Sequence, residues 1–184
     1  MIHGAGVLRR AAVERLGIPA LFMSDGPMGV RAEFADDEWR NTGTTEDFVS
    51  YLPCNSAIAS TWNRKLAKSA GQVLGEEARG RGKDIILAPG INIKRSPLCG
   101  RNFEYFSEDP LIAGTMASAK VNGIQSQHIA ASAKHFCANN KEENRMDSDS
   151  IVSERALREI YLKGFEICVK NSQPWTVMTS YNIW

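Results

Sequence analysis

Short apolar runs alternate with longer amphipathic segments along this 184-residue chain, and the alternation limits the folds that it can adopt. Several runs have the length of strands and end at polar or turn-forming residues, namely 19–23, 84–88, 129–136 and 175–180. Segments with apolar residues at helical spacing separate them, namely 63–79, 110–124 and 153–168. Strand, loop, helix and strand in this order predict parallel βα units in an α/β fold. Residues 52–59 are predicted to form a further strand or an irregular segment.

Two of the helices have clear start signals. Asp109 precedes Pro110, which is the pairing of a capping side chain with proline in the first turn. Ser153 caps the third helix, whose apolar stripe is the most regular in the chain: Leu157, Ile160, Tyr161, Gly164, Phe165 and Cys168. No repeat or internal linker interrupts the pattern, so residues 1–184 are predicted to form one domain.

The composition excludes several classes of protein. The net charge is +1 and 43% of the residues are hydrophobic, so there is no electrostatic argument for nucleic acid or a membrane surface. No apolar stretch has the length of a transmembrane helix, and residues 1–17 lack the apolar core of a signal peptide. We therefore expect no nucleic-acid or membrane partner and a cytoplasmic location.

Cysteine and histidine patterns give no sign of a metal site. The four cysteines, Cys54, Cys99, Cys137 and Cys168, form no CxxC pair, and no histidine stands at ligand spacing from them. We expect reduced thiols, several of them buried. No metal and no cofactor are predicted.

Polar residues recur where the predicted strands end. Asp25 follows the first strand, Arg101 lies in the long loop 87–110 after the second, Lys134 and His135 close the third, and Tyr181 follows the fourth. In a parallel α/β barrel the active site forms at the carboxyl ends of the strands. These residues are therefore predicted to converge on one site.

The residue types favour a neutral ligand that is rich in hydroxyl groups. Asp25 can accept two hydrogen bonds from a diol, Arg101 and Arg145 are forked donors, and His135 can donate or accept. Simpler explanations remain for each residue taken alone. Asp25 could belong to an ordinary turn, Arg101 could neutralise Glu104 or Glu108, and Tyr181 could be a core residue.

Longer motifs resemble one enzyme family. They are SDGPMGVR at 24–31, LAPGINIKRSPLCGRNFEYFSEDP at 87–110, KHFCANNKEENR at 134–145, VSERALREIYLKGFE at 152–166 and VMTSYN at 177–182. Together they resemble the N-terminal catalytic domain of glycoside hydrolase family 3, of the β-glucosidase kind. The resemblance implies an incomplete (β/α)8, TIM-like barrel with parallel strands. It also implies a retaining hydrolase that acts on terminal non-reducing β-D-glycosyl residues of a β-glucoside or oligosaccharide.

The same resemblance implies a role for each motif residue. In such enzymes the aspartate of the first motif binds the outer hydroxyls of the non-reducing sugar, and the other motifs complete that subsite. The substrate-binding residues implied here are Asp25, Arg101, Lys134, His135, Arg145, Met178 and Tyr181.

The chain departs from the family in what it omits. The family's nucleophile is an aspartate in a strand motif beyond SYN, and the general acid of glucosidase-like members lies in a second domain. We therefore expect no catalytic residue in this chain, which would be a fragment that is inactive alone. Its incomplete barrel would leave apolar faces such as 157–165 uncovered and promote self-association. The loop 137–145 contains no histidine, unlike the N-acetylglucosaminidase branch.

Three alternatives remain open. One is a β-xylosidase of the same family. Another is a Schiff-base aldolase or lyase in which Lys134 is the amine nucleophile and Arg101 and Arg145 hold a phosphate or carboxylate. The last is a non-catalytic sugar-binding fragment.

Overall fold

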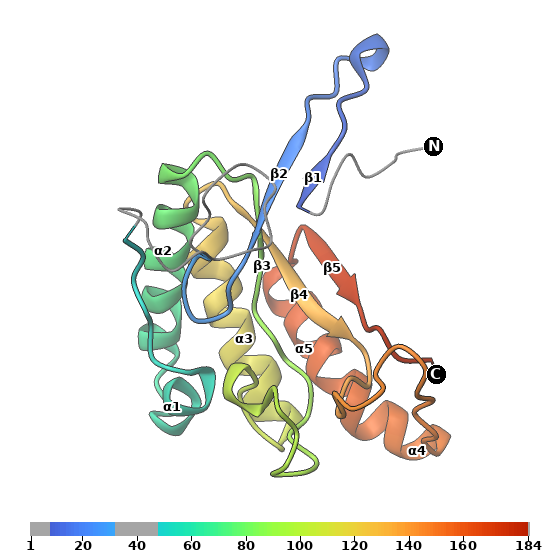
Figure 1. The fold of residues 1–184 in the computed structure, drawn as a ribbon. Helices are drawn as coiled ribbons and strands as arrows, with labels where there is room; N and C mark the ends of the chain where they lie inside the picture. The colour runs from blue at the N-terminus through green and yellow to red at the C-terminus, as the bar shows by residue number, and fades with distance from the viewer. Residues whose placement is uncertain (1–7, 32–47, 184) are drawn as a thin grey trace.

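The computed structural model describes residues 8–31 and 48–183 of the chain. Residues 1–7, part of the stretch searched for a signal peptide, lie outside the described residues. Strands form one sheet in the order β1-β2-β3-β4-β5 (Figure 1). Their bounds are β1 Arg9–Arg10, β2 Leu21–Asp25, β3 Ile85–Leu87, β4 Ala130–Phe136 and β5 Thr176–Thr179. Strands β2 to β5 pair in parallel, while β1 runs antiparallel to β2.

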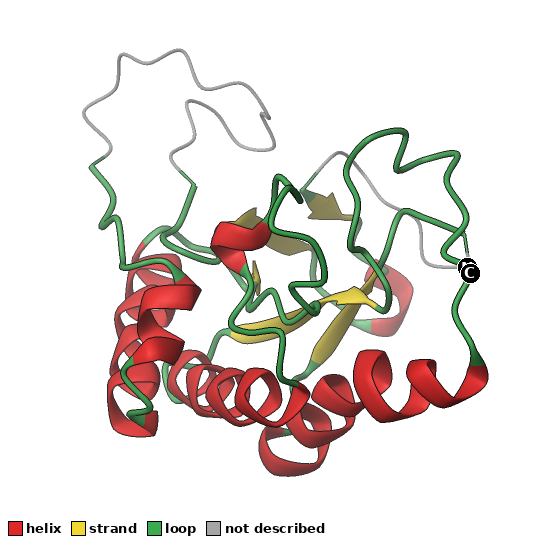
Figure 2. Ribbon diagram, turned by 90° about the horizontal axis from the view of Figure 1, so that it is seen from below, coloured by secondary structure: helices red, strands yellow, loops and turns green. Residues whose placement is uncertain are grey.

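Helices connect the parallel strands. Their bounds are α1 Asn55–Ser60, α2 Arg64–Gly80, α3 Pro110–Gln125, α4 Glu154–Ala156 and α5 Leu162–Ser172. The long helices α2, α3 and α5 lie along one side of the sheet, and the long loops gather at the end where the parallel strands finish (Figures 1 and 2). This arrangement of parallel strands inside an outer layer of helices is the predicted α/β architecture, a partial barrel. The antiparallel strand β1 was not anticipated.

Capping side chains fix where the helices begin. Asp109 accepts hydrogen bonds from the backbone N–H groups of Leu111 and Ile112 at 2.7 and 3.0 Å, with Pro110 in the first turn. Ser153 accepts one from Ala156 at 3.3 Å. Each bond satisfies a donor that the first helical turn leaves without a partner. Both predicted helix starts are confirmed.

Two predictions about secondary structure need correction. A strand over 52–59 is wrong, because α1 occupies Asn55–Ser60 and buries Asn55, Ile58 and Ala59 along one helical face. The third helix is present and runs without a gap from Glu154 to Ser172, but its segment Leu157–Tyr161, between α4 and α5, is π-helical and not α-helical. Its apolar stripe is also covered in part: Phe165 is only 2% exposed, whereas Ile160 is 38% exposed.

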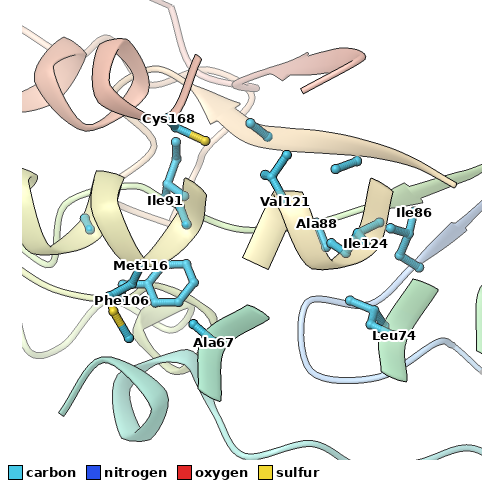
Figure 3. Packing of buried hydrophobic residues seen from close by; sticks show 14 of the residues in the cluster. Ala67, Leu74, Ile86, Ala88, Ile91, Phe106, Met116, Val121, Ile124 and Cys168 are labelled. Atoms are coloured by element: carbon cyan, nitrogen blue, oxygen red, sulfur yellow. The ribbon is translucent and has the colours of Figure 1, made fainter. Parts of the chain in front are cut away.

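The core lies between the sheet and the helices. Figure 3 shows Leu74 of α2, Val121 and Ile124 of α3 and Ile86 of β3 packed in this layer, all of them fully buried. Helices α2 and α3 approach so closely that a Cβ added to Gly71 would lie 2.2 Å from the carbonyl oxygen of Lys120. None of the helices in the two described ranges is long and apolar enough to cross a membrane. The cysteines are free thiols, two of them buried.

Candidate substrate-binding site

The carboxyl ends of the parallel strands surround a pocket of about 590 Å³. Its lining contains all the residues singled out from the sequence together with two leucines: Leu8, Asp25, Leu87, Arg101, Lys134, His135, Arg145, Met178 and Tyr181. The predicted convergence of distant segments is therefore what the fold produces. Whether these residues hold a sugar stays a prediction.

Asp25 is the last residue of β2 and is held by one of its two carboxylate oxygens. Oδ1 accepts hydrogen bonds from Lys134 Nζ at 2.6 Å and from the backbone N–H of Gly26 at 3.0 Å. Gly26 has φ +141°, and an added Cβ would lie 1.6 Å from the carbonyl oxygen of Gly29, so this tight turn requires glycine. The other oxygen, Oδ2, has no partner among the described residues. The side chain is 26% exposed.

Glu104 lies behind Asp25 and is engaged by two cations. Its Oε1 accepts a hydrogen bond from Arg101 Nε, and its Oε2 is 3.6 Å from Lys134 Nζ. The side chains of Glu104 and Lys134 are each 2% exposed. Desolvation lowers the pKa of Arg101, but the attraction and hydrogen bond of Glu104, with smaller contributions from Tyr105 and Glu142, together raise the pKa overall. Of the two carboxylates that Arg101 was predicted to neutralise, Glu104 is the partner.

His135 is a neutral imidazole with one nitrogen facing no protein partner. Its Nδ1 is 3.2 Å from Tyr105 Oη and 3.3 Å from Asn92 Oδ1. Burial, helped by the charges of Arg101, Lys134 and Arg145, lowers the pKa of His135 to about 2. The Nε2 atom is buried and has no hydrogen-bond partner within the described part of the chain. Such an atom needs a ligand or water partner.

Arg145 and Tyr181 form the opposite wall. The guanidinium carbon of Arg145 lies 4.3 Å from the centre of the Tyr181 ring, which is cation–π distance. Arg145 Nη1 also donates to Glu142 Oε2 at 2.9 Å. Tyr181 is 38% exposed and its ring centre is 6.3 Å from that of His135, so it is a wall of the pocket and not a core residue.

Buried amides that the sequence did not single out position these side chains. Asn92 is the clearest case: its Nδ2 donates to the carbonyl oxygens of His135 and Cys137 at 2.8 and 2.7 Å, and its Oδ1 accepts from the N–H of His135 at 2.7 Å. Asn139 donates to Tyr105 Oη at 3.1 Å. A lone asparagine in a loop carries no signal of burial, so these roles needed the fold.

One missed residue did leave a signal. Lys120 lies between Met116 and Val121 on the apolar face of α3, and it is fully buried. A lysine inside an apolar helical stripe is rarely buried without a specific partner. Within the described residues, no group of three or more histidine, cysteine, aspartate or glutamate side chains could hold a metal ion.

A partial barrel of parallel strands with a polar pocket at their carboxyl ends places the chain in the class of (β/α)-barrel domains. Comparison with known families is consistent with this class: the chain belongs to the family described as glycosyl hydrolase family 3 N terminal domain, whose pattern matches residues 7–184. The resemblance inferred from the motifs is therefore confirmed.

Relatives and solved structures agree with the family. Thermostable β-glucosidase B of Acetivibrio thermocellus is 49% identical over 170 residues, which is 92% of this chain and 22% of the relative. An exo-α-(1→6)-L-arabinopyranosidase of Bifidobacterium longum is 44% identical over 182 residues, 99% of this chain and 24% of the relative. The structure of β-glucosidase 3B from Thermotoga neapolitana in complex with glucose superposes with a TM-score of 0.86 at 52% identity, over 95% of this chain and 24% of that one. The chain thus spans about a quarter or less of the length of these proteins.

Proposed function

We propose that this chain forms the subsite for the terminal non-reducing sugar in a retaining, β-glucosidase-like glycoside hydrolase. The observation that carries the proposal is the meeting of Asp25, Arg101, Lys134, His135, Arg145, Met178 and Tyr181 around one pocket. They come from loops and strand ends that are far apart in the sequence. A pocket with several convergent polar groups at this end of a barrel is the usual place for a substrate.

The free hydrogen-bonding atoms suit hydroxyl groups. Asp25 Oδ2 can accept from a sugar hydroxyl while Oδ1 stays bound to Lys134. Arg101 uses Nε for Glu104, which leaves its terminal nitrogens to donate. The buried Nε2 of His135 would gain the partner that the described residues do not supply. Hydrogen bonds of this kind that strengthen as positive charge develops on the sugar would lower the barrier as well as aid binding.

The relatives make D-glucose the first ligand to test. Two of those described above are called β-glucosidases, and one of these was solved with glucose. The arabinopyranosidase shows that close relatives can bear the name of another sugar. The β-xylosidase alternative is not better supported than the glucosidase by these comparisons.

We also propose that Asp25 binds substrate, that Glu104 supports Arg101, and that neither carboxylate cleaves the substrate. A retaining glycosidase needs a nucleophile and a general acid about 5–5.5 Å apart, each free to react. Asp25 is bonded to Lys134 and Glu104 to Arg101. The nucleophile and the acid would then be supplied from outside residues 1–184, as the motif comparison implies.

The Schiff-base alternative fits the geometry poorly. A lysine nucleophile is activated by apolar burial or by a neighbouring cation. Lys134 instead faces two carboxylates, those of Asp25 at 2.6 Å and Glu104 at 3.6 Å. Borohydride trapping of an adduct on Lys134 would favour this alternative.

The proposal is tested by titrating the 184-residue chain with D-glucose, with L-glucose as the control ligand. We expect binding of D-glucose only, and Asp25→Asn should weaken it by about tenfold or more because a charged acceptor is lost. Asp147→Asn, an exposed carboxylate outside the pocket, is the matched control and should bind normally. Absence of binding, or equal binding of both enantiomers, would refute the proposal.

Turnover separates the roles of the carboxylates. We expect no hydrolysis of nitrophenyl β-D-glucoside by this chain alone. Hydrolysis that disappears in Asp25→Ala would place a catalytic carboxylate within the chain. A non-catalytic sugar-binding protein gives the same binding result, and it is favoured only if the gene product that contains this chain lacks glycosidase activity.

A further inference from the structure

A series of buried hydrogen bonds connects the two loops that face each other across the mouth of the site. Lys120 Nζ donates to the carbonyl oxygen of Pro27 at 2.5 Å and to Asn55 Oδ1 at 2.7 Å. Asn55 Nδ2 then donates to the carbonyl oxygen of Glu104 at 2.6 Å. Lys120 and Asn55 are both 0% exposed. One end of this series of hydrogen bonds therefore holds residues 25–31, the Asp25 loop, and its other end holds residues 101–104, the Arg101 loop.

The two loops enclose a shared space. Among the described residues, those that line a second pocket of about 430 Å³ all come from these two loops: Asp25, Gly26, Pro27, Arg31, Arg101, Phe103 and Glu104. Asp25 and Arg101 line the larger pocket as well. A change in the spacing of the loops would therefore move two of the groups that face the sugar.

Lys120 projects from a close contact between the backbones of α2 and α3. A Cβ added to Gly71 would lie 2.2 Å from the carbonyl oxygen of Lys120, and a Cβ added to Gly123 would lie 2.1 Å from the carbonyl oxygen of Lys68. Such close backbone contact between α2 and α3 leaves little room for the helices to shift. The backbone that carries Lys120 is therefore firmly placed, while its acceptors belong to the Asp25 loop, through Pro27, and to the first residue of α1, Asn55.

Lys120 contributes little to stability by itself. It forms no ion pair with any described residue, and burial lowers its pKa to about 7. A buried ammonium without a carboxylate partner is costly, and an apolar side chain of similar size would often be as stable or more so. What an apolar side chain cannot replace is the pair of hydrogen bonds to Pro27 and Asn55.

We propose that Lys120 and Asn55 are positioning residues that set the spacing between the Asp25 loop and the Arg101 loop, and thereby the affinity of the sugar subsite. This inference rests on the proposed function for its effect on sugar binding. Its structural half, the restraint on the loops, can be measured without a ligand. The effect on sugar binding and the restraint on the loops can therefore be refuted separately.

The test replaces Lys120 by methionine, an unbranched side chain that is one atom shorter and has no donors. We expect D-glucose affinity to fall by about tenfold, the effect of losing a hydrogen bond or two in this setting. The amide of Arg31, which donates to the carbonyl oxygen of Asp25 at 2.9 Å, should exchange its hydrogen about tenfold faster. The amide of Val121 in α3 should exchange as before, because the helix layer is not loosened. Lys68→Met, on the exposed face of α2, is the control and should change neither.

A merely structural role for Lys120 would slow or speed all core amides together, and that result would overturn the proposal. Unchanged affinity and unchanged Arg31 exchange would overturn it as well. If Lys120→Met does not fold, Asn55→Asp decides, since it keeps the acceptor for Lys120 and removes the donor to Glu104. Affinity equal to that of the parent in Asn55→Asp would then reject the inference. If the unsubstituted chain binds no D-glucose, the proposed function is refuted. Hydrogen exchange at the Arg31 amide then decides alone whether Lys120 restrains the loops.

Discussion

The contact between α2 and α3 gives a prediction whose size can be worked out from the structure. Gly71 faces α3 so closely that the Cβ of an alanine would lie 2.2 Å from the carbonyl oxygen of Lys120, 3.0 Å from its carbonyl carbon and 3.1 Å from the Cα of Gly123. All of these neighbours are backbone atoms, which cannot rotate away. Gly71→Ala must therefore push the helices apart.

The magnitude follows from two opposing effects. An ordinary carbon–oxygen contact is longer than this one by about 1 Å, so the helices must separate by a comparable distance and lose dispersion contacts along the interface. Overpacking of this kind costs about 1–3 kcal/mol. Alanine regains about 1 kcal/mol because it favours the helix more than glycine does. We expect a net loss of about 1 kcal/mol in the free energy of unfolding, or roughly 2–4 °C in Tm for a chain of this size.

Gly80 provides a matched control at the end of the same helix. A Cβ added there meets no atom within 4 Å, so Gly80→Ala should leave the stability unchanged or raise it slightly. The measurement is urea unfolding of both variants followed by circular dichroism, with the slope against urea compared as well. Equal stability of Gly71→Ala and Gly80→Ala would show that the interface yields easily and would refute the argument that it anchors Lys120.

Two further predictions concern buried charges. Glu104→Gln should lower the free energy of unfolding by about 3 kcal/mol, because Arg101 loses its carboxylate partner and Lys134 keeps only Asp25 of its two. Glu154→Gln, which breaks an exposed ion pair with Arg158, should cost less than about 1 kcal/mol, and similar costs for both would contradict the prediction. His135 has a pKa of about 2 in the folded chain, below its value of about 6.5 in the unfolded chain. Below a pH of about 6.5 the unfolded chain therefore binds a proton that the folded chain does not bind. The free energy of unfolding must fall as the pH drops below about 6.5. Between pH 7 and pH 5 this contribution is roughly 2 kcal/mol, and urea unfolding of His135→Asn should lack it; an equally steep acid loss in the variant would argue against a neutral, buried imidazole.

Local signals were enough to predict most of the fold. Asp109 and Ser153 announce helix starts because a capping side chain satisfies backbone donors in any fold, and both caps are present. The strands were found because buried parallel strands are short, continuous apolar runs. Residues 52–59 misled the same reasoning, since a short apolar run does not separate a strand from a single helical turn. Tertiary burial of Ile58 and Ala59 decides for the helix.

The site could be predicted to the extent that it depends on topology. Parallel pairing brings the carboxyl ends of strands to one edge, so Asp25, Lys134 and Tyr181 had to lie near one another once the strands were assigned. The supports behind them could not be predicted in this way. Asn55 bonds to a carbonyl 49 residues away and Asn92 to one 43 residues away, and nothing in the local sequence selects those partners.

The arrangement of charge around the pocket explains why residue types alone indicated a neutral ligand. Arg101 pairs with Glu104, Lys134 with Asp25 and Arg145 with Glu142, so each of these cations has its own carboxylate. A phosphate or carboxylate substrate would have to compete with these carboxylates for the cations and would face the exposed Oδ2 of Asp25. A sugar hydroxyl can instead donate to that oxygen and accept from Arg101 without breaking any of the pairs. The balance of charge thus disfavours the lyase alternative on grounds that are independent of Lys134 chemistry, and it leaves hydrogen bonding to discriminate among sugars.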